Sequence, residues 1–178
     1  KIMTVVTADG RLGDDQKMKI TSEDLGPEGD SKLIVGDTWR AKDLRDFTLL
    51  TSSNDGAFAL AAVAESEQIM PPYNNTLASP EELRNQFIKE MNNTASQIGL
   101  INSKFFNEHG LDNTADRGGA YGSAKDMALL FEYSLKNYPE IFQIVSDLLP
   151  GEIGKTSEHL LGYYYVQEIS SMLSVIAL

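Results

Sequence analysis

The chain has 178 residues, of which 42% are hydrophobic and 23% are charged, which is enough for one domain with a sizeable core. Its formal net charge of -11 disfavours binding to the phosphate backbone of nucleic acids. The absence of cysteine excludes disulfides, thiol nucleophiles and cysteine-ligated metal sites, and no apolar run approaches the roughly 20 residues of a membrane-spanning helix.

The beginning of the chain predicts a buried helix followed by short strands. Ile2–Ala8 is apolar, as in the inner turns of a buried helix, and Asp9-Gly10 marks a turn. Lys17–Thr21 alternates between polar and apolar residues, which favours a half-buried strand. A second short strand is expected over Lys32–Val35, before a turn at Gly36-Asp37.

The middle of the chain is predicted to be mainly helical. One helix is expected over Ala41–Leu50 and a second over Asp55–Glu65, whose small side chains allow close packing inside a core. Ser79–Glu82 is typical of a helix start with a capping box, and Gly99 ends that helix. Another helix is expected to start at Ser123–Asp126. The apolar residues at helical spacing are Trp39, Leu44, Phe47 and Leu50, then Leu83, Phe87, Met91, Ala95 and Ile98, then Met127, Leu130, Phe131 and Leu135.

The end of the chain is predicted to form strands. A short helix from Pro139 to about Val145 is followed by strands over Gly162–Val166 and Met172–Leu178. Helices in the middle and strands at the end predict an α+β architecture with helices packed on an antiparallel sheet. We expect one partial domain over residues 1–178, mainly helical over about 38–147 and sheet over 151–178. Since the chain starts with lysine, has no signal peptide and stops on an apolar strand, we expect a processed or partial piece, incomplete at both ends.

Two familiar binding motifs are incomplete. Gly154-Lys155-Thr156 ends like a phosphate-binding loop, but Leu149 stands where that loop needs glycine. The two histidines, His109 and His159, match no common metal-ligand spacing. We therefore expect no metal and no cofactor.

A Ser52, His109 and Asp112 triad is a weak interpretation, because nothing places the serine on a nucleophile elbow. The segment from His109 to Asp112 is more typical of a structured turn, in which Gly110 is free to adopt a positive φ.

Ser52-x-Asn54 lies where one predicted helix ends and the next begins. Taken alone, these two residues are more typical of helix caps than of a catalytic site. The order along the chain is Lys1, then Ser52-x-Asn54, then Lys155-Thr156. Serine acyl transferases that recognise penicillin use Ser-x-x-Lys, Ser-x-Asn and Lys-Thr-Gly in this same order.

Longer segments carry a closer resemblance; they are Lys1–Thr4, Ser52–Ala61, Ile98–Asp112 and Tyr121–Ala128. The chain resembles the serine-type D-alanyl-D-alanine carboxypeptidases, which are low-molecular-mass penicillin-binding proteins. The resemblance runs from Lys1 to roughly Val145 and implies the β-lactamase/transpeptidase-like fold, an antiparallel sheet flanked by a helical cluster. Class A β-lactamases share fold and motifs, but the turn after Glu108 favours the carboxypeptidases. Ser157 departs from the family, which has glycine at that position.

The resemblance implies a mechanism. Its substrate would be a peptidoglycan stem peptide ending in D-Ala-D-Ala, and β-lactam antibiotics would bind the same site. A serine three positions before Lys1, outside this chain, would be the nucleophile. Lys1 would act as general base, Ser52 would relay a proton to the leaving amine, and Asn54 would hold Lys1 and the substrate amide. The residues implied for substrate binding are Lys155, Thr156, Ser157 and Glu158.

Two functions stay open: an active carboxypeptidase, or an inactive protein of the same fold that binds cell-wall peptides or regulates wall enzymes. A serine three positions before Lys1 would support catalysis, and any other residue the inactive protein. A third interpretation, an acidic helical interaction domain, requires the motif order to be coincidence. The resemblance implies a place outside the cytoplasmic membrane after removal of a signal peptide. Peripheral membrane association would require segments that this chain does not contain.

Overall fold

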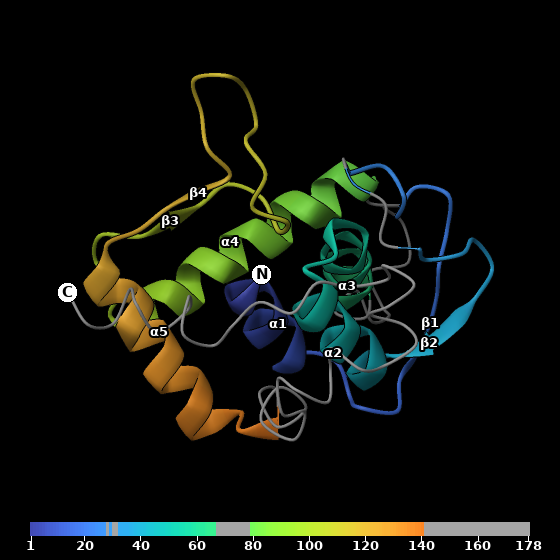
Figure 1. Cartoon of the computed structure of the whole chain (residues 1–178), viewed down its shortest axis with the longest axis horizontal. Coiled ribbons are helices and arrows are strands. Elements are labelled where there is room, and N and C mark those ends of the chain that lie inside the picture. Colours follow the sequence, from blue (N-terminus) through green and yellow to red (C-terminus); the bar gives the residue numbers. More distant parts are fainter. Residues whose placement is uncertain (28, 30–31, 67–78, 141–178) are drawn as a thin grey trace, which may run out of the picture.

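The structure is a computed structural model that describes residues 1–27, 29, 32–66 and 79–140. It contains helices together with two short antiparallel strand pairs (Figure 1). In chain order the elements are α1 (Ile2–Asp9), β1 (Lys17–Lys19), β2 (Thr38–Arg40), α2 (Ala41–Thr51), α3 (Asn54–Ser66), α4 (Pro80–Ile98), β3 (Lys104–Phe105), β4 (Ala120–Tyr121) and α5 (Ala124–Asn137).

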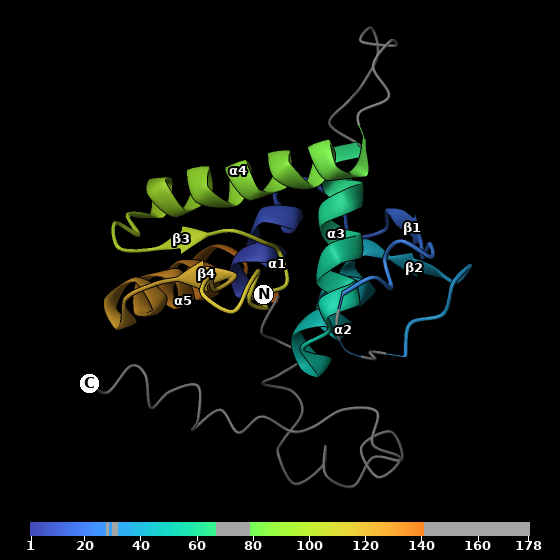
Figure 2. The ribbon, with the colours of Figure 1, turned by 90° about the horizontal axis from the view of Figure 1, so that it is seen from above.

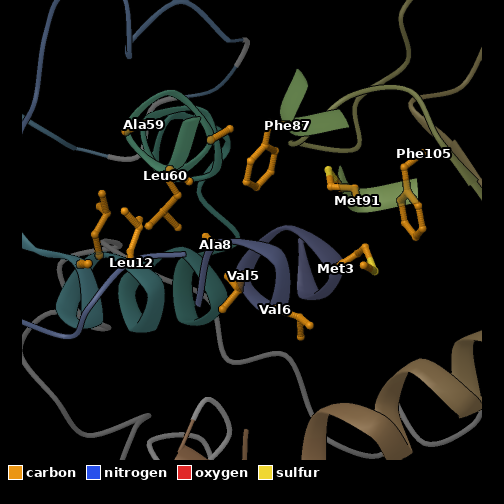
Figure 3. Packing of buried hydrophobic residues seen from close by; sticks show 14 of the residues in the cluster. Met3, Val5, Val6, Ala8, Leu12, Ala59, Leu60, Phe87, Met91 and Phe105 are labelled. Carbon is orange, nitrogen blue, oxygen red and sulfur yellow. The ribbon is translucent and has the colours of Figure 1, made fainter. Parts of the chain in front are cut away.

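Helix α1 lies at the centre of the described structure and contacts α2, α3, α4 and α5 (Figures 1 and 2). Every side chain from Met3 to Ala8 is buried, which confirms the predicted buried helix. A helix that is buried on all sides needs apolar residues all round its axis, as this one has. Figure 3 shows Val5 of α1, Leu60 of α3 and Phe87 of α4 within one core.

Helices α2 and α3 form where the sequence predicted them, but the strand before them does not. The expected strand at Lys32–Val35 is wrong; β2 is formed instead by Thr38–Arg40 and pairs with β1, with Met18 opposite Trp39. Trp39 therefore lies on a strand and not on the helix spacing, although its ring packs 5.1 Å from that of Phe47 on α2. Ile34, in the expected strand, is 63% exposed, so its side chain is not packed as the inward face of a strand would be.

The predicted signals at both ends of α4 are confirmed. The Ser79 hydroxyl accepts a hydrogen bond from the Glu82 N–H, and the Ser79 N–H donates to the Glu82 carboxylate at 2.7 Å. Gly99 ends the helix at a φ of 92°, which glycine adopts without a steric penalty. Between these ends, Phe87 and Met91 are fully buried against α1 and α3 (Figure 3).

Helix α5 starts at Ser123, whose hydroxyl accepts from the Asp126 N–H at 3.1 Å. Leu130 and Ser134, four residues apart, are buried. The prediction that Leu135 points inward is wrong, because its side chain is 47% exposed. It follows Ser134 by one residue, about 100° further round the helix, and so leaves the buried face.

Some predicted elements lie outside the described residues: most of the helix up to Val145, and the strands Gly162–Val166 and Met172–Leu178. The division into a helical part and a sheet part therefore stays a prediction. Within the described ranges, no helix has the length and apolar character needed to cross a membrane.

Candidate functional site

Lys1 stands at the start of α1, where its carbonyl accepts a hydrogen bond from the Val5 N–H at 2.9 Å. The residue is half-buried. Burial lowers the pKa of its side-chain ammonium from the ordinary value, because the charged form loses hydration. In both views the N-terminal end lies between α5 and the α2–α3 pair (Figures 1 and 2). An amine with a lowered pKa at this place suits a general base.

At the junction of α2 and α3, two neighbouring serines have different roles. Ser52 ends α2 in the left-handed region, at φ 55° and ψ 35°. Ser53 is buried, and its hydroxyl caps α3 by accepting a hydrogen bond from the Gly56 N–H at 2.8 Å. Ser52 is exposed, and its hydroxyl forms no hydrogen bond with any described residue. The cap expected at this boundary is thus made by Ser53, which leaves the Ser52 hydroxyl available to a ligand.

Close packing of two helices fixes this junction. A Cβ at Gly56 of α3 would collide with the hydroxyl of Thr48 on α2. The Thr48 hydroxyl is itself held by a 2.6 Å hydrogen bond that it donates to the Leu44 carbonyl. Glycine is therefore required here for α2 and α3 to approach, and the approach sets where Ser52 lies.

Asn54 begins α3 and lies beside the loop that precedes β2. A Cβ at Gly29 would come within 3.3 Å of the Asn54 Nδ2 atom. Gly29 also has a φ of 115°, which other residues rarely adopt. The loop backbone therefore passes close to the Asn54 carboxamide and restricts its position.

A buried network joins α1 to the segment that follows β3. The Thr4 hydroxyl, one helical turn after Lys1, donates a 2.5 Å hydrogen bond to the Glu108 carbonyl. The Glu108 side chain has no exposed surface, and its carboxylate lies 2.8 Å from the Arg84 guanidinium. That guanidinium also stacks over the Phe58 ring, at 4.3 Å from the ring centroid. No sequence pattern predicted a role for Arg84 or Glu108; the one local signal is the family-like segment around the glutamate.

His109 lies in the same network. Burial is the main cause that lowers the pKa of this imidazole from 6.5; the neighbouring Glu108 carboxylate opposes the shift, and the positive charges of Arg84 and Lys1 add to it. The imidazole Nδ1 accepts from the Leu111 N–H at 3.1 Å. Together with the φ of 84° at Gly110, this confirms the predicted structured turn.

The other predicted site residues, Lys155, Thr156, Ser157 and Glu158, lie outside the described residues, so their place stays a prediction. The described part of the chain contains no group of three or more histidines, aspartates and glutamates that could hold a metal ion.

Solved structures show which fold this chain has. A D-alanyl-D-alanine carboxypeptidase from Mycobacterium tuberculosis matches with a TM-score of 0.63 at 22% identity, over 80% of this chain and 47% of that one. A Streptomyces DD-transpeptidase matches with a TM-score of 0.62 at 24% identity, over 81% of this chain and 52% of the other. These matches confirm the predicted α+β, transpeptidase-like fold.

Sequence comparisons show which protein family this chain resembles. Residues 82–149 match the family described as D-alanyl-D-alanine carboxypeptidase. The carboxypeptidase DacC of Escherichia coli is 31% identical over 112 residues, 63% of this chain and 23% of the relative. DacF of Bacillus subtilis is 30% identical over 143 residues, 76% of this chain and 31% of the relative. The chain spans less than a third of the length of these curated relatives. The resemblance to serine-type D-alanyl-D-alanine carboxypeptidases is thus confirmed.

Proposed function

We propose that this chain forms part of a serine-type D-Ala-D-Ala carboxypeptidase that trims peptidoglycan stem peptides through an acyl-enzyme. The observation that carries the proposal is the half-buried Lys1 at the start of a helix in which every residue from Met3 to Ala8 is buried. Through Thr4 this helix is joined to the Glu108 segment, which lies inside the residues that match the carboxypeptidase family. The relatives named above are carboxypeptidases, which supports the same reaction here.

The reaction proceeds in two steps. The hydroxyl of a serine three positions before Lys1 attacks the carbonyl of the penultimate D-Ala, and its proton passes to the Lys1 amine. The peptide bond then breaks, and the terminal D-Ala leaves as the free amine after receiving a proton through Ser52. Water next attacks the ester, so the shortened stem peptide is released with a new carboxylate and the serine hydroxyl is restored.

Burial of Lys1 supports its role as the base. A free lysine has a pKa of about 10.4 and is almost fully protonated near neutral pH. Loss of hydration lowers the pKa of Lys1, which raises the fraction of neutral amine. Asn54 holds Lys1 and the substrate amide in this mechanism, and the loop at Gly29 limits the movement of its carboxamide.

The proposal also gives roles to Lys155, Thr156, Ser157 and Glu158, and a location to the enzyme. Lys155 and Thr156 bind the terminal carboxylate of the stem peptide, Ser157 stands where the family has glycine, and the N–H of Glu158 contributes to the oxyanion hole. These four residues belong to the sheet part, 151–178, of a domain whose helical part covers about 38–147. Because peptidoglycan lies outside the cytoplasmic membrane, the enzyme acts there, and β-lactams acylate it as substrate analogues.

Two assays on the folded, full-length protein test the proposal. A fluorescent penicillin should label it covalently, and unlabelled penicillin added first should prevent the labelling. A synthetic peptide ending in D-Ala-D-Ala should release one D-Ala per molecule, while the same peptide ending in L-Ala should release none. A folded protein that is neither labelled nor releases D-Ala would overturn the proposal.

A further inference from the structure

An open groove of about 560 Å³ lies between α4 and the segment that contains β3. Its α4 wall consists of residues at positions i, i+3, i+4, i+7 and i+8, which share one helix face: Asn85, Ile88, Lys89, Asn92 and Asn93. In both views β3 runs beside α4 (Figures 1 and 2). The core side of the helix, with Phe87 and Met91, is a different face, so the groove is separate from the packing of α1.

Three cations line this groove. Lys89 comes from α4, Lys104 from β3, and Arg117 from the loop before β4. All three are exposed, and none forms an ion pair with a residue in the described ranges. The chain as a whole carries 26 acidic and 15 basic residues, so three cations gathered in one groove run against its overall charge. Such a patch attracts anionic groups.

Hydrogen bonds and a cation–ring contact hold the walls of the groove in place. The Asn92 Nδ2 donates to the Phe105 carbonyl at 2.8 Å, and its Oδ1 accepts from the Phe105 N–H at 3.0 Å. This pair of bonds clamps β3 onto α4. On the opposite wall, the Arg117 guanidinium lies over the Phe106 ring at 4.5 Å from its centroid. A preformed groove loses less conformational freedom when a ligand binds.

The groove also lies close to the start of α1. The Asn107 Nδ2 donates to the Asn113 Oδ1, on the groove wall, at 2.7 Å. Asn107 directly precedes Glu108, whose carbonyl accepts from Thr4 on α1. The groove wall and α1 are therefore linked through the short Asn107-Glu108 segment.

We propose that this groove binds an acidic amino-sugar oligosaccharide, namely the glycan of peptidoglycan with its carboxylate-bearing stem peptides. The exposed carboxamides of Asn85, Asn93 and Asn113 match the hydroxyl and acetamido groups of amino sugars, because a carboxamide both donates and accepts. The Asn93 amide already donates one hydrogen bond to Glu90, and the Asn113 oxygen accepts one from Asn107, which leaves each with a second N–H or lone pair for a ligand. The cations match the free carboxylates of the stem peptides. The identity of the glycan rests on the proposed function, whereas the binding of an acidic oligosaccharide is measured independently of catalysis.

Titration calorimetry on the full-length protein tests the groove. The probe is a soluble peptidoglycan fragment of several disaccharide-peptide units, used with free carboxylates and again after the carboxylates are amidated. The variant is Lys89→Gln/Lys104→Gln, and the matched control is Lys125→Gln/Lys136→Gln, which removes two exposed cations from α5. Loss of two surface charges should weaken binding of the acidic fragment roughly fivefold, and the control should leave it unchanged.

Further probes in the same calorimetric experiment identify the class of ligand. Amidated fragments and a neutral N-acetylglucosamine tetramer should bind more weakly than the acidic fragment, and salt should weaken the acidic fragment most. Equal affinities for the groove variant and the control would overturn the inference, as would tighter binding of a glycerol-phosphate polymer. Penicillin labelling of the groove variant should match wild type; if no form is labelled, the proposed function fails while the calorimetry still decides the groove.

Discussion

The Arg84 guanidinium lies 2.8 Å from the carboxylate of Glu108, a residue whose side chain is wholly buried. Since the same guanidinium stacks on Phe58, this ion pair joins α4, α3 and the turn at His109. Thr4 adds α1 through the Glu108 carbonyl. The pair therefore holds the first turn of α1, which bears Lys1, against the segment most typical of the carboxypeptidases.

Removing the positive charge from this pair should destabilise the protein. Arg84→Met leaves the buried Glu108 carboxylate without its partner, and we expect the free energy of unfolding to fall by about 3 kcal/mol. Lys89→Met, on the exposed face of the same helix, should change it by less than about 0.5 kcal/mol. Urea unfolding measures both. Equal, small effects of the two changes would show that the ion pair does not stabilise the fold.

The two serines at the α2–α3 junction should respond in opposite ways. Ser53→Ala removes the cap of α3 and should cost about 1 kcal/mol of stability. Ser52→Ala removes an exposed hydroxyl, so stability should stay within about 0.5 kcal/mol while acylation by penicillin slows at least about 100-fold. Thermal unfolding and stopped-flow labelling give the two readouts. Normal acylation in Ser52→Ala would remove Ser52 from the mechanism.

Gly56 should not tolerate a larger residue. Gly56→Ala brings a methyl group against the Thr48 hydroxyl, and we expect a loss of about 1–3 kcal/mol from the overpacked contact. Adding Thr48→Ala should recover part of this loss, because it removes the colliding atom. Gly13→Ala is the control, since its Cβ would meet no atom within 4 Å. If Gly56→Ala is as stable as the control, the helices can separate without cost.

His109 should make stability depend on pH. Its pKa is lower in the folded protein than the ordinary 6.5, so the unfolded chain binds the proton more readily. The stability that results is complete above pH 6.5 and is lost as the pH falls towards the folded-state pKa. The urea midpoint should therefore decrease between pH 7.5 and about 5.5, and less so in His109→Gln. An imidazole that titrates at or above 6.5 by NMR would contradict this.

Much of the fold was predictable because its signals are local. The capping box at Ser79 and the glycine at residue 99 fixed the ends of α4 from adjacent residues. Trp39 shares a helical spacing with Phe47 that a strand also allows, and only its pairing with Met18 shows that it lies on a strand.

The Arg84–Glu108 pair joins residues 24 positions apart, so no short pattern could show it. The Ser52 and Ser53 roles were likewise not separable from sequence. Either serine could cap a helix, and the left-handed backbone at Ser52 is a property of the folded junction.

The central claim is that Lys1 activates a serine nucleophile, and mass spectrometry tests it most directly. Full-length protein mixed with benzylpenicillin should gain the mass of one penicilloyl group, at a rate that rises with pH as the Lys1 amine loses its proton at a pKa below 10.5. Lys1→Gln, shown to be folded by circular dichroism, should gain no such mass on the same timescale. An adduct that forms equally fast in Lys1→Gln, with the same pH dependence, would contradict the account.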